Sequence, residues 1–182
     1  GNTVSAVINH IAPHSMPGST VVQLNGAANA FDSGTLYSDS IISTLAKAYD
    51  SSAVHFPVPA FFDYVETKNA LVRERSIRRV LDVIDSCDLV VFGVGAMDPA
   101  MPSHVYAGGY LSSTELKEAR EDGVVGDICT VLIREDGTTD MPLNARASGP
   151  LPAQLKRIST RLCVVAGSAK VPALLGALRA GV

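Results

Sequence analysis

The sequence contains no tryptophan and only three cysteines, Cys87, Cys129 and Cys163, which lie far apart and form no Cys-x-x-Cys pair. This odd, scattered set supports neither a disulfide framework nor a zinc site, and it favours a reduced, cytoplasmic setting. No apolar run approaches the roughly 20 residues that a membrane-spanning helix needs. The first residues also lack the basic region of a signal peptide. We therefore expect a cytoplasmic protein that does not contact a membrane.

The sequence also lacks an excess of charge of one sign. The formal net charge is −3 and the pI is about 5.8, so the chain has no basic footprint for nucleic acid. The basic run between Arg73 and Arg79 is typical of a solvated helix face. Hydrophobic residues make up 47% of the chain, and the mean hydropathy is +0.22. These values favour one domain, residues 1–182, around a single sizeable core.

Helical and extended patterns alternate along the chain, which predicts an α/β protein with a doubly wound, mostly parallel, Rossmann-like sheet. Leu89–Phe92 has no polar residue and no alternation, so we expect a strand that is buried on both faces. The turn signal Asp136-Gly137 follows another expected strand and predicts a small hairpin. The expected strands span residues 19–24, 53–58, 89–92, 129–134 and 161–165, and helices are expected near residues 4–11, 41–49 and 77–84. A further helix is expected to open at Ser112, where Ser112 and Glu115 have the spacing of a capping box, and the last helix carries Leu174, Leu175 and Leu178.

Glycine-containing turns follow three of the expected strands, at Asn25-Gly26-Ala27, at Gly93-Val94-Gly95 and at residues 166–170. Ligands of open α/β sheets bind at the carboxyl ends of strands, and glycines let the backbone approach them. The third turn precedes a helix, so its N–H groups and the charge of Lys170 could hold a phosphate. In the alternative interpretation the glycines only turn the chain, and Lys170 is solvated.

For two further candidate binding elements, a purely structural role is the alternative. Gly1-Asn2-Thr3 could be a fourth loop whose strand is cut away, or a tag remnant followed by a helix cap. Asp127 could accept hydrogen bonds from sugar hydroxyls, or it could cap a turn. The four histidines show no metal-ligand spacing, so neither a metal nor a cofactor is expected.

Several short motifs occur in a specific joint order over essentially the whole chain. They are Val21–Gly26, Phe56–Ala60, Phe92–Ala96, Gly108–Ser112, Gly123–Ile128, Asn144–Arg146, Val165–Lys170 and Gly176–Gly181. Together they resemble the effector-binding domain of SorC/DeoR-type bacterial transcriptional regulators. Two positions depart from that pattern: Gly26-Ala27 stands where the family often has Gly-Gly, and Ser168 replaces a glycine of the last loop.

The resemblance implies a fold related to phosphosugar isomerases and deaminases, with a sugar phosphate or related carbohydrate as effector. It implies a homo-oligomer that contacts operator DNA only through a helix-turn-helix segment absent here, so the domain is expected to be truncated at both ends, without its first strand. The phosphate would contact Thr3, Asn25-Gly26 and Lys170, with Asp127 toward the sugar, and the regions after Gly95 and Asn144 would complete the pocket. The expected effector-binding residues are Gly1, Asn2, Thr3, Asn25, Gly26, Ala27, Gly93, Gly95, Asp127 and Lys170.

The leading hypothesis is therefore a ligand-sensing domain without catalytic residues. A phosphosugar isomerase or deaminase is the alternative, and it needs a positioned base. Ribose-phosphate isomerases carry a dense acidic loop where this chain has only Asp98, which argues against catalysis. A third interpretation is a purely structural oligomerisation domain, which would not respond to any ligand.

Overall fold

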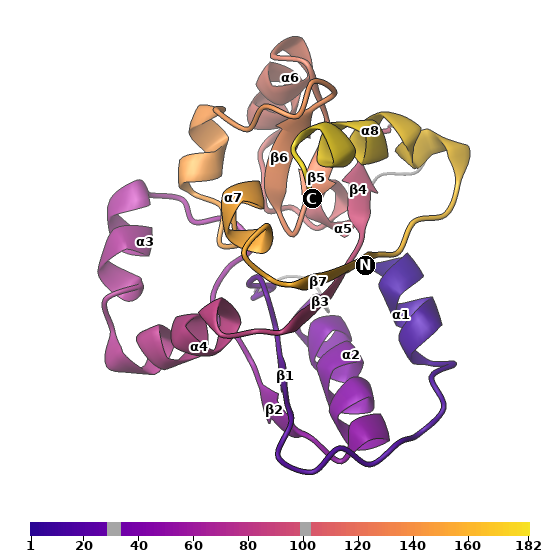
Figure 1. Cartoon of the computed structure of the whole chain (residues 1–182). Helices are drawn as coiled ribbons and strands as arrows, with labels where there is room; N and C mark the ends of the chain where they lie inside the picture. The colour runs from indigo at the N-terminus through magenta and orange to yellow at the C-terminus, as the bar shows by residue number, and fades with distance from the viewer. Residues whose placement is uncertain (29–33, 99–102) are drawn as a thin grey trace.

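The computed structural model describes residues 1–28, 34–98 and 103–182 as a mixed α/β fold (Figure 1). Its strands are β1 (Thr20–Val22), β2 (Ser52–Val54), β3 (Leu89–Phe92), β4 (Val94–Ala96), β5 (Val124–Ile128), β6 (Val131–Arg134) and β7 (Thr160–Cys163). Its α-helices are α1 (Asn2–Ile8), α2 (Gly34–Tyr49), α3 (Val65–Leu71), α4 (Arg75–Asp85), α5 (His104–Ala107), α6 (Ser113–Glu121), α7 (Pro152–Leu155) and α8 (Val171–Arg179), and two 3-10 turns are η1 (Pro142–Ala145) and η2 (Ser168–Lys170).

Parallel strands are confirmed, in two separate pairs. β1 pairs with β2 in the register Thr20↔Ser52, and β3 pairs with β7 in the register Leu89↔Thr160. The remaining strands form an antiparallel sheet in the order β4-β5-β6. The described strands therefore divide between parallel pairs and an antiparallel sheet that is larger than the small hairpin expected.

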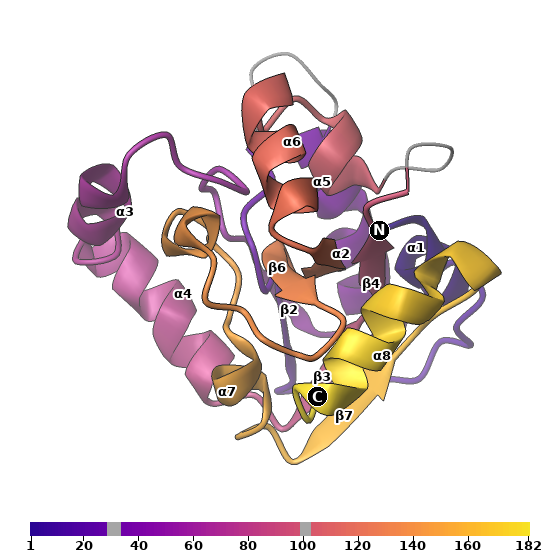
Figure 2. The same cartoon turned by 90° about the horizontal axis from the view of Figure 1, so that it is seen from above.

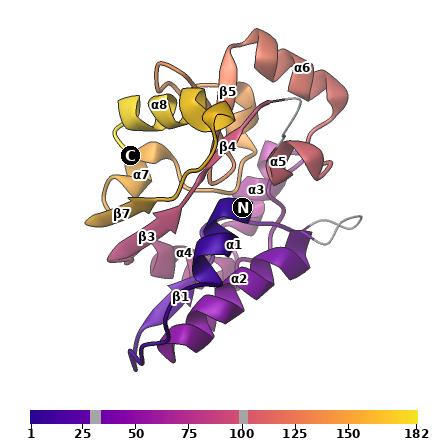
Figure 3. The same ribbon diagram turned by 90° about the vertical axis from the view of Figure 1, so that its right-hand side faces the viewer.

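The chain passes from one kind of sheet to the other at Gly93, between β3 and β4. The expectation that β3 is buried on both faces is wrong in part: Val90 is 2% exposed, whereas Leu89 is 53% exposed. Helices α1 and α2 lie on one side of the β3–β7 pair and α8 lies on the other (Figures 2 and 3). Leu89 stands at the first position of β3, and the helices leave it uncovered.

The hairpin also differs from the prediction. The strand expected at residues 129–134 begins only at Val131, because Cys129 and Thr130 form the turn between β5 and β6 with φ values of 49° and 74°. Positive φ at both central residues is the backbone of a type I′ hairpin turn, which usually carries Asn or Gly. Asp136-Gly137 does form a turn, in which the Gly137 N–H donates to the Arg134 carbonyl over 3.0 Å, but no strand follows it directly.

Other elements follow the sequence pattern closely. α6 begins at the predicted capping box, in which Ser112 Oγ accepts from the Glu115 N–H over 3.2 Å and Glu115 Oε2 accepts from the Ser112 N–H over 2.7 Å. α8 presents its small residues Ala173, Gly176 and Ala177 to the core, where close backbone approach is possible. α1 ends at Ile8, three residues earlier than expected, and β2 ends at Val54.

Candidate ligand-binding site

One cavity of about 510 Å³ gathers the candidate residues from turns that are far apart in the sequence. It is lined by the start of α1, the loop after β1, the β3–β4 junction, the end of β5 and the loop before α8. All ten residues expected from the sequence line it: Gly1, Asn2, Thr3, Asn25, Gly26, Ala27, Gly93, Gly95, Asp127 and Lys170. The turns that follow separate strands therefore do converge on one place.

Lys170 and Thr3 meet in this cavity although they are 167 residues apart. Lys170 Nζ donates to Thr3 Oγ1 over 3.0 Å, which ties η2 to the first turn of α1. Lys170 takes part in none of the ion pairs between described residues. Its ammonium group is therefore directed by a neutral hydroxyl and keeps its charge available to an anion.

Asp127 supplies the acidic group of the cavity, and it is only 4% exposed. Its Oδ2 accepts from the Thr130 N–H over 3.1 Å, and its Oδ1 accepts from Ser103 Oγ over a long 3.4 Å. Burial raises the pKa of this carboxyl above its ordinary value, and the hydrogen bond from Thr130 opposes that rise. No described cation forms an ion pair with Asp127, so a ligand hydroxyl would find a buried acceptor with spare capacity.

Two neighbours of Asp127 share its buried environment. The Tyr106 hydroxyl has no hydrogen-bond partner of good geometry among the described residues, and burial, followed by the charge of Asp127, raises its pKa well above the usual value. Cys129 lines the cavity, and burial together with Asp127 raises the pKa of its thiol to about 12. Cys129 is therefore a neutral thiol rather than a nucleophilic thiolate.

Two glycines at this site are required by the close packing of neighbouring protein atoms. Gly95 lies in β4 directly opposite Asp127, and a Cβ there would collide with Asp127 Oδ1 and come within 2.8 Å of Ser103 Oγ. A Cβ on Gly26 would collide with the backbone carbonyl oxygens of Val58 and Pro59. Close packing within the protein therefore already requires both glycines, apart from any ligand approach or turn geometry that the sequence predicted for them.

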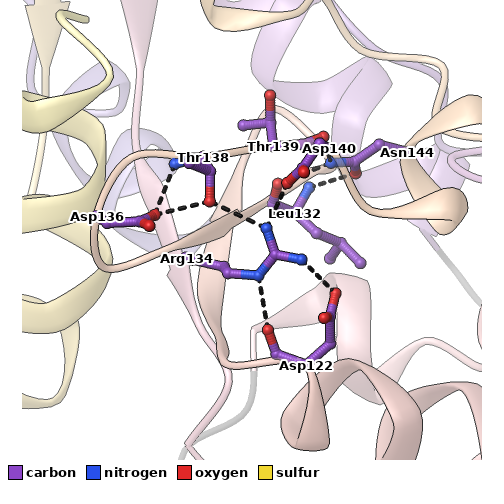
Figure 4. A network of polar contacts seen from close by, with 8 residues as sticks. All are labelled: Asp122, Leu132, Arg134, Asp136, Thr138, Thr139, Asp140 and Asn144. Atoms are coloured by element: carbon purple, nitrogen blue, oxygen red, sulfur yellow. Dashed lines mark hydrogen bonds and ion pairs between the residues drawn. The ribbon is translucent and has the colours of Figure 1, made fainter.

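Asn144 and Arg146 do not line the first cavity, so the expectation that the region after Asn144 completes the pocket stays a prediction. Asn144 instead lines a second cavity of about 540 Å³. Its side-chain amide forms hydrogen bonds with the backbone of β6 and of the loop that follows β6 (Figure 4). Asn144 Oδ1 accepts from the Leu132 N–H over 2.7 Å, and Nδ2 donates to the carbonyls of Leu132 and Thr139, each over 2.8 Å. Arg146 pairs with Glu115 and donates to the Asp63 carbonyl over 3.2 Å, away from the first cavity.

Sequence reasoning missed several residues that line the first cavity, including Ser103, Tyr110 and Ser38. Tyr110 stands in the noted Gly108–Ser112 motif, but nothing in that motif predicted where its side chain points. Part of the loop after Gly95, residues 99–102, lies outside the described residues, and Ser103 is its first described member in the cavity. Ser148 was also missed: its Oγ accepts from the Gly26 N–H over 2.9 Å and so fixes the loop after β1.

Within the described ranges, no three His, Cys, Asp or Glu side chains come together as metal ligands. In the same ranges no helix has the length and apolar character needed to cross a membrane. In the described part of the cavity, the chemistry is therefore that of the Lys170 ammonium group, the α-amino group of Gly1, one buried carboxyl, several hydroxyls and amides, and an apolar lining.

Comparison with known proteins places this geometry in a family. The Sugar-bind family, described as a sugar-binding domain, matches residues 1–182. The chain is 28% identical over 180 residues to the deoxyribonucleoside regulator of Bacillus subtilis (strain 168). The matched segment covers 98% of the chain and 56% of that protein. The chain thus spans little more than half the length of this curated relative.

Solved structures agree with this match over the full length of the chain. A domain of "a possible sugar-binding transcriptional regulator" from Arthrobacter aurescens TC1 is 46% identical with a TM-score of 0.91, covering 100% of this chain and 70% of that one. A DeoR family transcriptional regulator from Listeria monocytogenes is 28% identical with a TM-score of 0.85, again covering 100% and 70%. The chain therefore belongs to the family of sugar-binding domains found in SorC/DeoR-type transcriptional regulators.

Proposed function

We propose that the first cavity binds a phosphorylated sugar and that this chain is the sensing domain through which the sugar controls a transcriptional regulator. The observation that carries the proposal is that one cavity contains both a cationic side chain and a buried carboxyl group. Lys170, held by Thr3 over 3.0 Å, offers a cation, and the buried Asp127 offers a hydrogen-bond acceptor. A sugar phosphate presents an anion together with several hydroxyl donors.

The phosphate is assigned to the Lys170 end. Lys170 has a full charge without a described carboxylate partner, and Thr3 and the backbone around Asn25 add hydrogen-bonding groups. The sugar hydroxyls are assigned to Asp127, because its buried carboxylate accepts one close hydrogen bond, from the Thr130 N–H, and a long one from Ser103, so it can still gain from a ligand hydroxyl.

The effect on transcription is assigned to the full-length regulator, which would bind operator DNA through a helix-turn-helix segment outside this chain. We propose that it acts in the cytoplasm as a homo-oligomer. For the sugar phosphate to control DNA binding, it must bind one conformation of that oligomer more tightly than the other. The difference in binding free energy between the two conformations is typically ~1–3 kcal/mol. In the full-length protein we expect the sugar phosphate to change operator affinity by about 5- to 150-fold in a gel-shift titration.

A phosphosugar isomerase on the same fold is the second candidate, and the described part of the cavity does not favour it. Asp98, the single acid after the Gly93-Val94-Gly95 turn, lines neither cavity. Asp127 is the carboxylate available there, and it already accepts hydrogen bonds from the protein. We therefore propose binding without turnover.

We also propose that the two parallel pairs belong to one doubly wound sheet in the longer protein. Val22 and Leu24 of the β1 side and Val91 and Phe92 of β3 line the same cavity, yet β1 and β3 are not paired with each other.

The test is a calorimetric screen of this chain against pentose, hexose and polyol phosphates and the matching free sugars, with each mixture checked for conversion by NMR. Selective binding of one phosphate without conversion supports the proposal. Conversion to an isomer would establish the enzyme instead. If no phosphate binds to the folded chain, the proposed function is wrong.

A further inference from the structure

The second cavity, of about 540 Å³, lies outside the proposed sugar phosphate site, along α3, α4 and residues 139–154. Most of its wall is apolar, and much of that wall belongs to one core cluster: Phe56, Val58, Phe62, Ile77, Leu81 and Ile84. Ligand pockets typically have volumes of roughly 300–1,000 Å³, an apolar lining and a few polar groups that fix orientation. The second cavity is therefore large enough for a small molecule with an apolar body.

Lys68 places a cation at this cavity. It is the one basic residue among the described residues of the lining, and it is half-buried on α3. Its Nζ donates to the Ala145 carbonyl over 3.1 Å and takes part in none of the ion pairs between described residues. Burial lowers the pKa of this ammonium group, because burial removes water from the charge. An ammonium group has three N–H donors, so Lys68 can bind an anion and still donate to Ala145.

Two carboxyl groups also line the second cavity, and neither forms an ion pair with Lys68. Asp140 pairs with Arg134 instead. Asp85 is exposed at the last residue of α4, where that helix reaches α7 and has left α3 behind (Figure 2). An anionic group is therefore favoured at the α3 end of the cavity, and an apolar body between the two ends.

We propose that the second cavity is a separate binding site for a small carboxylate with an apolar body, in which the carboxylate pairs with Lys68 and the body lies along α4. A carboxylate suits this site better than a phosphate, because a single ammonium group balances one negative charge. The side chains of Asn144 and Ser148 are already bonded to the protein and offer a second charge little support. The two cavities would thus take ligands of different chemical classes.

The two cavities share part of their walls. Leu24 lines both of them. Ser148 lines the second cavity, and its Oγ accepts from the N–H of Gly26, which lines the first, over 2.9 Å. A ligand that displaces Ser148 would therefore alter the loop after β1, so we expect binding in the second cavity to be felt in the first.

The probe is octanoate, titrated into the unchanged chain and followed by NMR through the methyl groups of Ile77, Leu81 and Ile84. Saturable shifts of these signals with a Kd below about 1 mM are expected. Octylammonium carries the same chain with the opposite charge, and acetate carries the charge without the chain. Each is expected to bind at least about tenfold more weakly than octanoate. Octanoate that leaves these methyl signals unmoved, or equal binding of either control ligand, would overturn the inference.

Three variants test the pairing with Lys68. Lys68→Met keeps a long side chain without its charge and is expected to weaken octanoate binding about fivefold. Lys68→Arg keeps the charge and is expected to stay within about twofold of the unchanged chain. Lys117→Met on α6, where Lys117 pairs with Glu121, is the matched control and should have no effect. Unchanged octanoate affinity in Lys68→Met, or an equal loss in Lys68→Arg, would overturn the pairing.

The link to the first cavity has its own readout in the backbone amide signal of Gly26. Octanoate is expected to shift this signal, and Ser148→Ala is expected to remove most of that shift, because the bond to Gly26 is lost. A Gly26 signal that stays constant at saturation would overturn the link. None of these measurements needs a sugar phosphate, so the failure of this inference and the failure of the proposed function are distinguishable.

Discussion

Lys170 and Asp127 illustrate how single residues set the chemistry of this cavity. Lys170 is directed by Thr3 at 3.0 Å and has no carboxylate among the described ion pairs. Asp127 is buried with one good hydrogen bond and one long one. A buried carboxyl that is poorly solvated lowers the stability of the folded state. Such a group is characteristic of functional sites, where a ligand supplies the missing partners.

We predict that Lys170→Ala weakens sugar phosphate binding about tenfold or more, because a charge-assisted contact to the phosphate is lost. The unfolding midpoint in urea should change little, since the side chain of Lys170 forms a single hydrogen bond within the described residues, to Thr3. Isothermal titration calorimetry measures the effect. Lys117→Ala is the matched control, because Lys117 lies on α6 and pairs on the surface with Glu121. Unchanged affinity in Lys170→Ala would remove Lys170 from the site.

We predict that Gly95→Ala destabilises the chain by about 1–3 kcal/mol, as overpacking of a filled site does. The added Cβ would collide with Asp127 Oδ1, and the antiparallel neighbour Gly126 leaves little room for the strand to shift. Urea unfolding gives the value. In the background of Asp127→Ala the same change should cost clearly less, because the collision partner is gone. Additive effects would show that the collision is relieved elsewhere.

At the scale of elements, Asn144 holds the segment after β6 against the antiparallel sheet. Its amide bonds to both the N–H and the carbonyl of Leu132 and to the carbonyl of Thr139 (Figure 4). Arg134 reinforces the same loop by donating to Thr138 Oγ1 over 3.0 Å. It also ties β6 to the end of α6 by donating to the Asp122 carbonyl over 2.7 Å. The loop is thus held by polar contacts to β6 and by packing of Met141 and Leu143 on the core cluster that contains Leu132.

Asn144→Ala is expected to lower the free energy of unfolding by about 2–4 kcal/mol, because the buried Leu132 N–H loses its acceptor and three hydrogen bonds disappear. Chemical denaturation measures this loss. Asn69→Ala on the exposed face of α3 is the comparison and should change stability by about 0.5 kcal/mol or less. Ligand affinity should persist in folded Asn144→Ala protein, because Asn144 lines the second cavity.

The elements with strong local signals could be predicted from the sequence. The capping box at Ser112 located the start of α6, and the apolar spacing of Ile77, Val80 and Ile84 located α4. The turn at Cys129-Thr130 could not be predicted, because neither residue is typical of positive φ and the long apolar run masks the break. The exposure of Leu89 likewise depends on which helices cover the sheet, and a strand's own residues do not encode that.

At the scale of the whole molecule, the candidate site is assembled from separate turns, each of which could be identified in the sequence. Thr3, Asn25, Gly95, Asp127 and Lys170 come from five segments and line one cavity. For Asn25 and Lys170, which follow the parallel strands β1 and β7, the rule that ligands bind at the carboxyl ends of strands predicted the location. Gly95 and Asp127 meet there through the antiparallel pairing of β4 with β5, which was not predicted. Tyr110 was not predictable, because its position depends on where the connection between α5 and α6 crosses the cavity. Whether these residues bind a ligand remains a prediction.

Stability should depend on pH through Asp127. Burial raises the pKa of its carboxyl, so the folded chain binds that proton more tightly than the unfolded chain does. Protonation therefore favours folding, and this contribution grows as pH falls through the raised pKa toward the ordinary value of 3.8. We expect the unfolding free energy of the unchanged chain to rise relative to Asp127→Asn as pH is lowered from neutral. A constant difference across this range would show that Asp127 is not perturbed.

The central claim is that the cavity between α1, the loop after β1 and the loop before α8 is the sugar phosphate site. A crystal structure of this chain with the phosphate selected by calorimetry tests it most directly. We predict phosphate oxygens within hydrogen-bond distance of Lys170 Nζ and Thr3 Oγ1, and a sugar hydroxyl on the Asp127 carboxylate. A ligand found in the second cavity, beside Lys68 and Asn144, would contradict the claim.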